Sequence, residues 1–322
     1  MGRAANSGGG RFVPESQAVI VEPARATVFL VVTIEPGHEE AVRDLLQDVS
    51  GLRRSVAFRA PDDRLTCVVG IGSEAWDRLF GGPRPRELHP FVELRGARHR
   101  APATPGDLLF HVRARRMDLC FELARLILER LSDAVTVVDE VQAFKYFDER
   151  DLLGFVDGSE NAEGAVAADE VFVGDEDPDF TGGSYVIVQK YLHDMTAWNA
   201  LSSDEQEKVI GRTKLANVEL PDDIKPADSH VALNTITDEH GDERKIIREN
   251  MPFGNLGKGE FGTYFIGYAR TPDVTEQMLR HMFLGDGRAA HDRILDYSTA
   301  MTGCLFHVPT VTFLDDPPAA PG

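Results

Sequence analysis

The sequence predicts an α+β protein made of two tandem ferredoxin-like units, each with the element order β-α-β-β-α-β. In both halves of the chain, β-branched apolar runs typical of buried strands are separated by segments of helical periodicity in that order. The stretch from Arg113 also resembles the stretch from Tyr268, 155 residues later, which indicates a tandem duplication. We expect the two units to pack sheet to sheet, in a dimeric α+β barrel-like arrangement around an apolar interior.

In the first unit the sequence predicts four strands and two main helices. The segments 38–49 and 117–131 have helical periodicity, and a short helix with an irregular segment is expected between the two middle strands. Short β-branched apolar runs predict strands over 27–34, 65–72, 107–114 and 134–147.

The second unit repeats this order. Helices are expected over about 195–211, over 273–283 and near 290–301. Strands are expected over 183–192, 244–250, 262–270 and 304–313.

The element order divides the chain into four parts. Gly, Ala and Pro are frequent in residues 1–24, and the tail 317–322 is rich in Pro, so both ends are expected to be flexible. The first ferredoxin-like unit spans 25–150. The part from 151 to 316 holds a connecting loop and the second unit.

Composition limits the class of protein. The net charge of −19 argues against a nucleic-acid groove and against binding to an anionic membrane surface. The three cysteines are scattered without a CxxC pair, which suits a reducing compartment and excludes a zinc ribbon. The chain has no apolar run of about 18 residues and no apolar core of a secretory signal near its start. We therefore expect a cytoplasmic protein.

The connecting loop contains the stretch LLGFVDGSEN, in which Asp157 stands directly before Gly158. An ordinary Asp-Gly turn is one interpretation, because Asp caps its own backbone and Gly accepts positive φ. The acidic run at 174–180 lacks the ligand order of a calcium loop, so we interpret it as a solvated surface segment.

Two further stretches carry candidate site residues. In RKIIRENMPFG, a period-2 strand places Arg248 and Asn250 on the same face. In an apolar pocket such a pair needs a charged or polar partner, although an exposed strand face with ordinary ion pairs is equally consistent with the pattern. His230, in ADSHVALN, precedes an apolar segment; none of the ten histidines forms an HExxH motif, but a haem needs only one axial ligand.

The stretches GFVDG, DSHV and IIRENMPFG, in this order, resemble the dye-decolourising peroxidase family, in particular its bacterial B-type branch. The resemblance continues to DRILDYSTAMTGCLFHVPTVTFLDD near the end of the chain and so covers nearly its whole length. It implies a haem peroxidase that holds one haem b per chain in the second unit. Such an enzyme uses hydrogen peroxide to oxidise dyes, phenols or other one-electron donors through a ferryl intermediate.

The resemblance implies a role for each candidate. Asp157 matches the distal aspartate, Arg248 the distal arginine, and Asn250 the asparagine that accompanies it in the B-type branch. His230 matches the axial iron ligand. Arg248 is also expected to contact the haem propionates, and the B-type resemblance gives it more weight than Asp157 in peroxide cleavage.

Further residues are expected around the cofactor. Gly158 lets the backbone lie close to the porphyrin, and Phe253 and Phe265 are expected to contact it. An iron-bound histidine usually gives its other N–H to a carboxylate. Asp292 is our choice for that partner of His230, and Asp296, one turn later, is the alternative.

Two alternatives remain at this point. One is another haem protein of the same architecture that acts on porphyrins or chlorite, and the other is a non-enzymatic haem carrier. The expected partners are peroxide and a small-molecule reductant, without nucleic acid or membrane, and a homo-oligomer from dimer to hexamer is expected. A bulky reductant that cannot enter the pocket would have to be oxidised at a surface aromatic residue. The candidates are Tyr185, Tyr191, Trp198, Tyr264 and Tyr297, although core packing alone explains most such aromatic residues.

Overall fold

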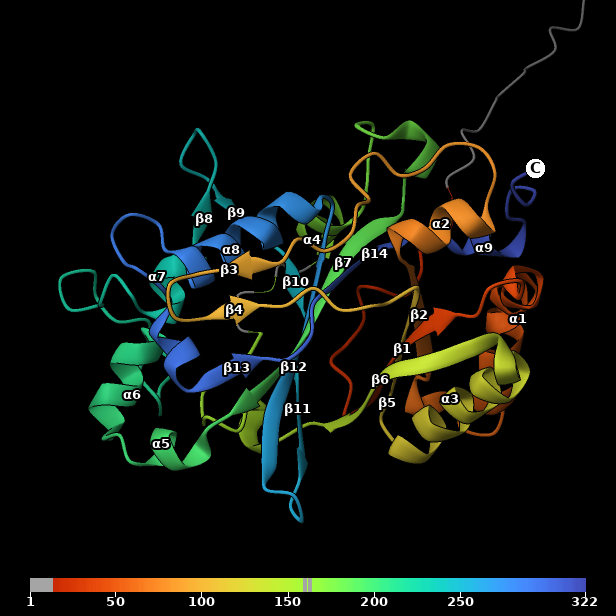
Figure 1. Ribbon diagram of the computed structural model, residues 1–322. Coiled ribbons are helices and arrows are strands. Elements are labelled where there is room, and N and C mark those ends of the chain that lie inside the picture. The colour runs from red at the N-terminus through yellow and green to blue at the C-terminus, as the bar shows by residue number, and fades with distance from the viewer. Residues whose placement is uncertain (1–13, 159–160, 162–163) are drawn as a thin grey trace, which may run out of the picture.

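The computed structural model describes residues 14–158, 161 and 164–322, and its first half follows the predicted order closely (Figure 1). The apolar stripe of α1 continues past the predicted end of the helix at 49, with Leu52 and Val56 partly buried against the core, so this helix is about one and a half times as long as expected. The helices are α1 (Glu39–Ala57), α2 (Ser73–Leu79) and α3 (Met117–Leu131), with 3-10 turns η1 (Pro61–Asp63), η2 (Ser132–Ala134) and η3 (Phe147–Glu149). The strands are β1 (Ala26–Ile34), β2 (Thr66–Ile71), β3 (Leu94–Arg95), β4 (Arg100–Ala101), β5 (Leu108–Ala114) and β6 (Val135–Phe144).

The second half contains more short elements than the sequence predicts. Its helices are α4 (Gly164–Val171), α5 (Met195–Asn199), α6 (Ser203–Ile210), α7 (His230–Asn234), α8 (Pro272–Leu284) and α9 (Val311–Asp315), with 3-10 turns η4 (Pro178–Phe180) and η5 (Arg293–Asp296). Its strands are β7 (Ser184–His193), β8 (Ile236–Thr237), β9 (Glu243–Arg244), β10 (Ile247–Arg248), β11 (Met251–Asn255), β12 (Glu260–Ala269), β13 (Ser298–Ala300) and β14 (Cys304–Val308).

The main strands of both halves join in one antiparallel sheet of ten strands. Its path is β10-β12-β7-β14-β2-β5-β1-β6, with β11 paired to β12 and β13 to β7. Each half has the strand order of a ferredoxin-like unit, and the halves meet where β14 pairs with β2 at His307 and Ile71. The predicted α+β class is confirmed. Over the described residues the end strands β10 and β6 do not pair, however, so the expected barrel-like closure does not form.

The core has two layers because the sheet is buried on both faces. On β1, Leu30 and Val32 belong to the cluster that includes α1 and α3, whereas Phe29 and Val31 belong to a second cluster that includes Tyr264 of β12. Alternate residues of a strand point to opposite faces, so a strand covered on both sides is apolar throughout. The Phe29 ring stacks on Tyr264 of β12, with 4.1 Å between ring centroids. The two halves therefore pack sheet against sheet.

Two segments near the end of the chain differ from the sequence prediction. The helix expected near 290–301 is instead the short turn η5 followed by β13, whose Ser298 pairs with His193 on β7. Backbone partners at this part of β7 override the local helical periodicity. The strand expected over 304–313 ends at Val308, because Pro309 has no N–H to donate, and α9 follows behind the Thr310 cap.

Both end segments that we expected to be flexible contact the domain where they are described. The Gln17 side chain is buried, and its Nε2 donates to the carbonyl oxygens of Val69 and Pro309 at 2.9 and 2.8 Å. Arg43 donates to the Pro318 carbonyl at 2.8 Å. Residues 1–13 lie outside the described part of the chain. Across that described part, each helix is too short or too polar to cross a membrane.

Candidate active site

A cavity of about 280 Å³ opens in the second half, between helices α7 and α8 on one side and strands β7, β10 and β12 on the other. Both charged groups and apolar side chains line it, so it can hold a ligand that is apolar over most of its surface and charged at its edge. Among the apolar residues of its wall are Ile246, Phe265, Met278, Leu279, Met282 and Ile294.

The loop that carries Asp157 is anchored through its apolar residues. Leu153 and Phe155 are buried in a small cluster with Trp198 of α5, and the Trp198 indole N–H donates to the Leu153 carbonyl at 3.0 Å. The Asp151 carboxylate accepts from the Phe155 amide at 3.0 Å and closes the turn. The apolar residues before Asp157 thus fix the loop, and Asp157 itself lines the cavity.

Asn161 connects this loop to the strand that carries Arg248. Its side-chain amide donates to the Arg248 carbonyl at 2.6 Å and accepts from the Arg248 amide at 2.9 Å. Gly158 has a φ of +75°, in the left-handed region that favours glycine, and a Cβ atom added to it would lie 3.5 Å from the Asn161 side-chain nitrogen. This turn therefore joins two segments whose residues Asp157 and Arg248 line the same cavity.

Arg248 and Asn250 both line the cavity, as the period-2 pattern predicts. The residue between them, Glu249, points the other way and forms an ion pair with buried Arg113 of β5. The Asn250 side-chain oxygen accepts from the Ile266 amide at 3.1 Å, which fixes its orientation. The Arg248 Nε atom is buried and has no hydrogen-bond partner among the described residues.

His230 reaches the cavity from the first turn of α7, behind the Ser229 cap. Its Nδ1 atom lies 2.7 Å from the Asp292 carboxylate, which is completely buried, and 3.2 Å from the Asn234 amide nitrogen. Asn234 also donates to the same Asp292 oxygen at 3.3 Å. Because Nδ1 is engaged, Nε2 is the ring nitrogen left for a ligand in the cavity.

Of the remaining residues that the sequence predicts for the site, some lie at the cavity or contact His230 and others do not. Of the two carboxylates proposed to partner His230, only Asp292 contacts it, because Asp296 instead contacts His99 and His291. Phe265 lines the cavity. Phe253 does not belong to the described wall of the cavity; its ring is in the core between the halves, with the Lys190 ammonium 5.5 Å from its centroid.

Two titratable groups of the wall have shifted pKa values. Burial raises the pKa of Asp151 to about 7, against the opposing effect of the hydrogen bond from the Phe155 amide. Burial lowers the pKa of His193 to about 4, so this ring is neutral at pH 7. The His193 nitrogens lie 2.8 Å from the Ser298 hydroxyl and 2.9 Å from the Thr263 hydroxyl.

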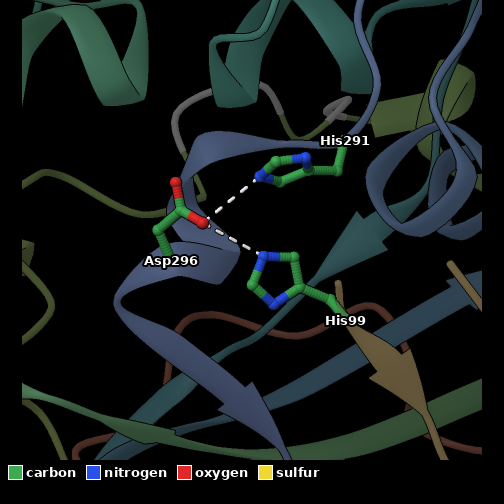
Figure 2. Close-up of side chains that lie close together, drawn as sticks. All are labelled: His99, His291 and Asp296. Atoms are coloured by element: carbon green, nitrogen blue, oxygen red, sulfur yellow. Dashed lines mark hydrogen bonds and ion pairs between the residues drawn. The ribbon is translucent and has the colours of Figure 1, made fainter. Parts of the chain in front are cut away.

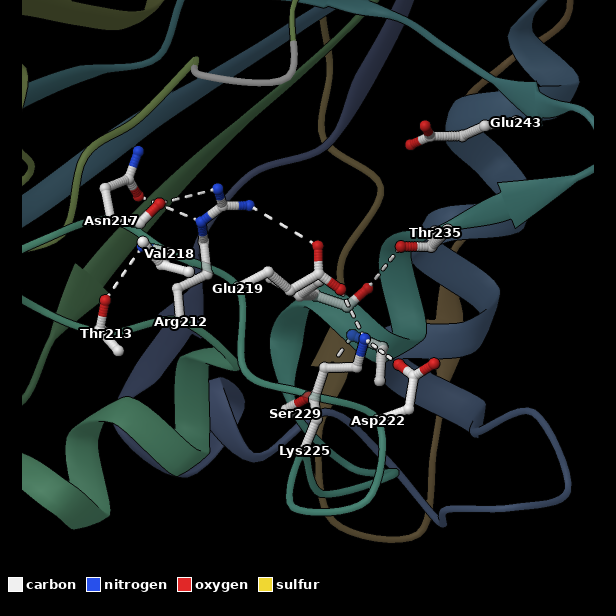
Figure 3. A network of polar contacts seen from close by, with 12 residues as sticks. Arg212, Thr213, Asn217, Val218, Glu219, Asp222, Lys225, Ser229, Thr235 and Glu243 are labelled. Carbon is white, nitrogen blue, oxygen red and sulfur yellow. Dashed lines mark hydrogen bonds and ion pairs between the residues drawn. The ribbon is translucent and has the colours of Figure 1, made fainter.

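A network of charges lies at another edge of the cavity (Figure 3). Glu219 contacts Arg212 on one side and Lys225 on the other, and Lys225 also pairs with Asp222 at 3.0 Å. Arg212, Glu219 and Glu243 all line the cavity. This edge is therefore charged, in contrast to the apolar wall.

Asp151, Asn161 and Asn234 were not identified as site residues from the sequence. Each acts through a hydrogen bond to a residue distant in the chain or to a loop backbone, and the periodicity of apolar residues in the sequence does not predict such a bond. The only signal was proximity, since Asp151 and Asn161 flank the VDG turn and Asn234 follows His230 by one helical turn.

Comparison with known families identifies the chain. The model of the Dyp-type peroxidase N-terminal domain matches residues 16–145, and that of the C-terminal domain matches residues 148–313. The chain belongs to the Dyp-type peroxidase family. Membership does not favour the two alternatives that the sequence left open, a porphyrin- or chlorite-processing protein and a non-enzymatic haem carrier.

Two kinds of relative support the Dyp-type assignment. A dye-decolorizing peroxidase from Mycolicibacterium paratuberculosis is 64% identical over 95% of this chain and 87% of its own length. An encapsulated DyP-type peroxidase from Mycobacterium smegmatis, solved by cryo-EM, is 63% identical with a TM-score of 0.95, over 96% of this chain and all of that one. An aspartate-to-alanine variant of DypB from Rhodococcus jostii, solved in complex with heme, is 57% identical with a TM-score of 0.92, over 94% and 98% of the two chains.

Proposed function

We propose that the cavity binds one haem b per chain with His230 as the axial ligand of the iron, and that Arg248 is the main residue acting on peroxide. As a Dyp-type peroxidase, the chain is a haem enzyme that uses hydrogen peroxide to oxidise a small-molecule reductant. The observation that carries the residue roles is the His230–Asp292 hydrogen bond on the wall of the cavity that also contains Asp157, Arg248 and Asn250.

The residues of the cavity fit a haem. An iron-bound histidine usually donates its other ring N–H to a carboxylate, which fixes the ring and makes it a more basic ligand; His230 and the buried Asp292 form this pair. The apolar wall suits the porphyrin faces. Buried polar atoms normally have partners, so the unpaired Nε of Arg248 indicates that a polar group of a ligand belongs beside it.

The bound haem supplies the redox chemistry, by taking up oxidising equivalents from peroxide and returning them to the reductant one electron at a time. The residues of the chain supply proton transfer and charge. Ionised Asp157 accepts the proton of one peroxide oxygen and delivers it to the other, which must leave as water. Arg248 is a fixed cation that stabilises the negative charge developing on the leaving oxygen.

Other residues hold these groups in place. Asn250 is oriented by its bond from the Ile266 amide and adds a polar side chain beside Arg248. Gly158 would let the backbone lie close to a bound haem, because it has no side chain, and Phe265 would contact the porphyrin from the apolar wall. Phe253 is left out of the proposed site because its ring packs in the core.

The peroxide step is tested by mixing the ferric, haem-loaded protein with one equivalent of peroxide in a stopped-flow instrument and following the Soret band. Loss of one group that stabilises charge in a transition state typically costs about 10²–10³ in rate. Arg248→Leu should slow the peroxide-dependent change by a factor of that order while haem binding survives.

Asp157→Asn is the companion variant. If Arg248→Leu reacts within a few-fold of the parent while Asp157→Asn is slow, the main role passes to Asp157. If both variants react at the parent rate, the proposed assignment of the peroxide site is wrong.

We further propose that the protein is a cytoplasmic homo-oligomer, between dimer and hexamer, whose reductants are dyes, phenols or similar one-electron donors. The three cysteines are free and buried, as suits a reducing compartment.

The end strand β6 exposes Val137, Val138 and Phe144, and an apolar sheet edge of this kind is commonly covered by another chain. Sedimentation velocity of the haem-loaded protein tests the assembly; a monomer at micromolar concentration would contradict it.

A further inference from the structure

A cluster of two imidazoles and a carboxylate lies outside the proposed haem site (Figure 2). The Asp296 Oδ1 atom lies 3.1 Å from the Nε2 atom of His99 and 3.2 Å from the Nε2 atom of His291. The three potential ligand atoms all lie within 4.8 Å of one another. All three side chains are at most one quarter exposed, so the cluster is partly shielded but open to solvent.

The cluster joins the two halves of the molecule. His99 stands in the β3–β4 hairpin, which belongs to the N-terminal family domain, whereas His291 precedes η5 and Asp296 is the last residue of η5, in the C-terminal domain. The hairpin contacts α8 and β13 of the second half. His291 directly precedes Asp292, the buried partner of His230. A ligand bound here would therefore tie the hairpin to the segment that supports His230.

The spacing of the three atoms suits a metal ion. Zinc binds imidazole nitrogen and carboxylate oxygen at about 2.0–2.2 Å in tetrahedral sites, which places neighbouring ligand atoms about 3.3–3.6 Å apart. The two observed separations of 3.1 and 3.2 Å require an outward movement of only a few tenths of an ångström. Two imidazoles with one carboxylate are also a ligand set that binds borderline divalent ions of the first transition row, and water completes the fourth position.

We propose that His99, His291 and Asp296 bind one divalent transition-metal ion, with the preferences of Zn²⁺, which clamps the β3–β4 hairpin of the first half to the η5 segment of the second. The ion binds to the two Nε2 atoms and to a carboxylate oxygen of Asp296, and both histidines lose any proton on Nε2 when it binds. The site is separate from the haem, so a failure of one proposal leaves the other intact.

Arg98 is the cation that the metal must displace. Its guanidinium lies 3.3 Å from the same Asp296 oxygen, and its side chain is 64% exposed. An exposed ion pair of this kind contributes little to stability, so Arg98 can turn toward solvent when the metal binds. The alternative is a hydrogen-bonded cluster in which Arg98 and the histidines alone neutralise Asp296, and that cluster would have no affinity for zinc.

The direct test is equilibrium dialysis of the haem-loaded full-length protein against micromolar ZnCl₂, with zinc and iron counted by elemental analysis. We expect one zinc ion per chain in the parent. Loss of an outer-shell partner typically weakens metal binding about 10- to 100-fold, so loss of a direct ligand in His99→Asn or Asp296→Asn should weaken it at least tenfold. His240→Asn is the matched control, because His240 is exposed and outside the cluster.

Arg98→Gln provides a second test that does not depend on weakened variants folding well. Removal of the competing positive charge should strengthen zinc binding relative to the parent, and zinc should raise the thermal unfolding midpoint of this variant and of the parent. The proposal is overturned if the parent retains no zinc, if His99→Asn binds zinc as tightly as His240→Asn does, or if Arg98→Gln leaves the affinity unchanged.

Discussion

Asp151 has the most strongly perturbed carboxyl group on the wall of the cavity. Burial is the main cause that raises its pKa to about 7, and the nearby Asp157 carboxylate adds to the shift. The Phe155 amide, which donates to it, opposes the shift only in part. Near pH 7 the group therefore exchanges a proton, next to the residue that we propose handles the proton of peroxide.

The raised pKa of Asp151 predicts a pH-dependent gain in stability for Asp151→Asn. Between about pH 4 and pH 7 the unfolded chain has lost this proton while the folded chain keeps it, so the parent loses stability as pH rises through this window. Below this pH window the carboxyl group is protonated in both the folded and the unfolded state, so it does not lower the free energy of unfolding. Asparagine stays neutral, so Asp151→Asn should not lose this stability. The expected gain over the parent is about 1.4 kcal/mol per unit of pKa shift, or a few kcal/mol above pH 7.

The measurement is the free energy of unfolding in urea from pH 4 to 9 for the parent, Asp151→Asn and the exposed control Asp204→Asn. The difference between Asp151→Asn and the parent should grow up to about pH 7 and then level off. Parallel curves for these two proteins would show that Asp151 has no raised pKa.

Four residues that the sequence predicts for the site, Asp157, His230, Arg248 and Asn250, line one cavity, and Asp292 lies behind His230, while their roles stay predictions. The sequence singles them out because they stand in short motifs that follow one another in the same order as in the family that the sequence resembles. Phe253 was placed beside the cofactor by the resemblance alone, whereas a period-2 count from Arg248 and Asn250 puts residue 253 on the opposite face of the strand, and its ring packs in the core between the halves.

At the scale of elements, one side chain joins the Asp157 loop to β10. Asn161 makes two hydrogen bonds to the backbone of Arg248, at 2.6 and 2.9 Å, and its own amide donates to the Gly158 carbonyl at 3.2 Å. An asparagine that pairs with both backbone groups of a residue acts like a strand partner. The relative position of loop and strand therefore depends on Asn161.

Asn161→Ala should reduce both stability and the rate of the peroxide reaction. Two hydrogen bonds at about 0.5–1.5 kcal/mol each give an expected loss of about 1–3 kcal/mol. Asn255→Ala is the control, because Asn255 also bonds a backbone amide, that of Lys258, but lies at the exposed β11–β12 turn. Urea unfolding and stopped-flow mixing with peroxide measure the two effects. Equal behaviour of the two variants would show that the loop is held by its apolar anchors alone.

The elements themselves were predictable where local pattern and tertiary packing agree. The helix expected over 117–131 matches α3, whose apolar stripe faces the sheet. Prediction failed over 290–301, where Asp292 caps a single turn and β7 offers backbone partners to Ser298–Ala300. Such pairing between distant segments leaves no trace in local periodicity. The short helix α7 was missed because five residues are too few to show a period.

At the scale of the whole molecule, the two halves are joined through the pairing of β14 with β2. Gly70 of β2 lies against Phe306 of β14, and a Cβ atom added to Gly70 would lie 2.8 Å from the Phe306 Cβ atom. The duplication in the sequence predicts two units packed face to face, but it does not report that their edge strands also pair, because that pairing involves only one residue from each strand. The sheet stays open for a separate reason, because over the described residues its end strands β10 and β6 do not pair.

Gly70→Ala should destabilise the protein. Extra atoms in a close-packed interior typically cost about 1–3 kcal/mol, and the nearest atom belongs to the Phe306 stem, which cannot move without the strand. Gly257→Ala is the control, because its added Cβ would have 3.6 Å to its nearest neighbour. The thermal unfolding midpoint should fall for Gly70→Ala and stay near the parent value for Gly257→Ala. Equal midpoints would mean that the junction is loosely packed.

The central claim is that His230 holds the haem iron, and haem retention in His230→Ala tests it most directly. His240→Ala is the control, since His240 is an exposed histidine outside the cavity. Both variants and the parent are loaded with haem, passed over a desalting column and compared by their absorption spectra and iron content. We expect the parent and His240→Ala to keep one haem per chain with the same Soret band, and His230→Ala to lose most of its haem. Full haem occupancy and an unchanged spectrum in His230→Ala would contradict the account.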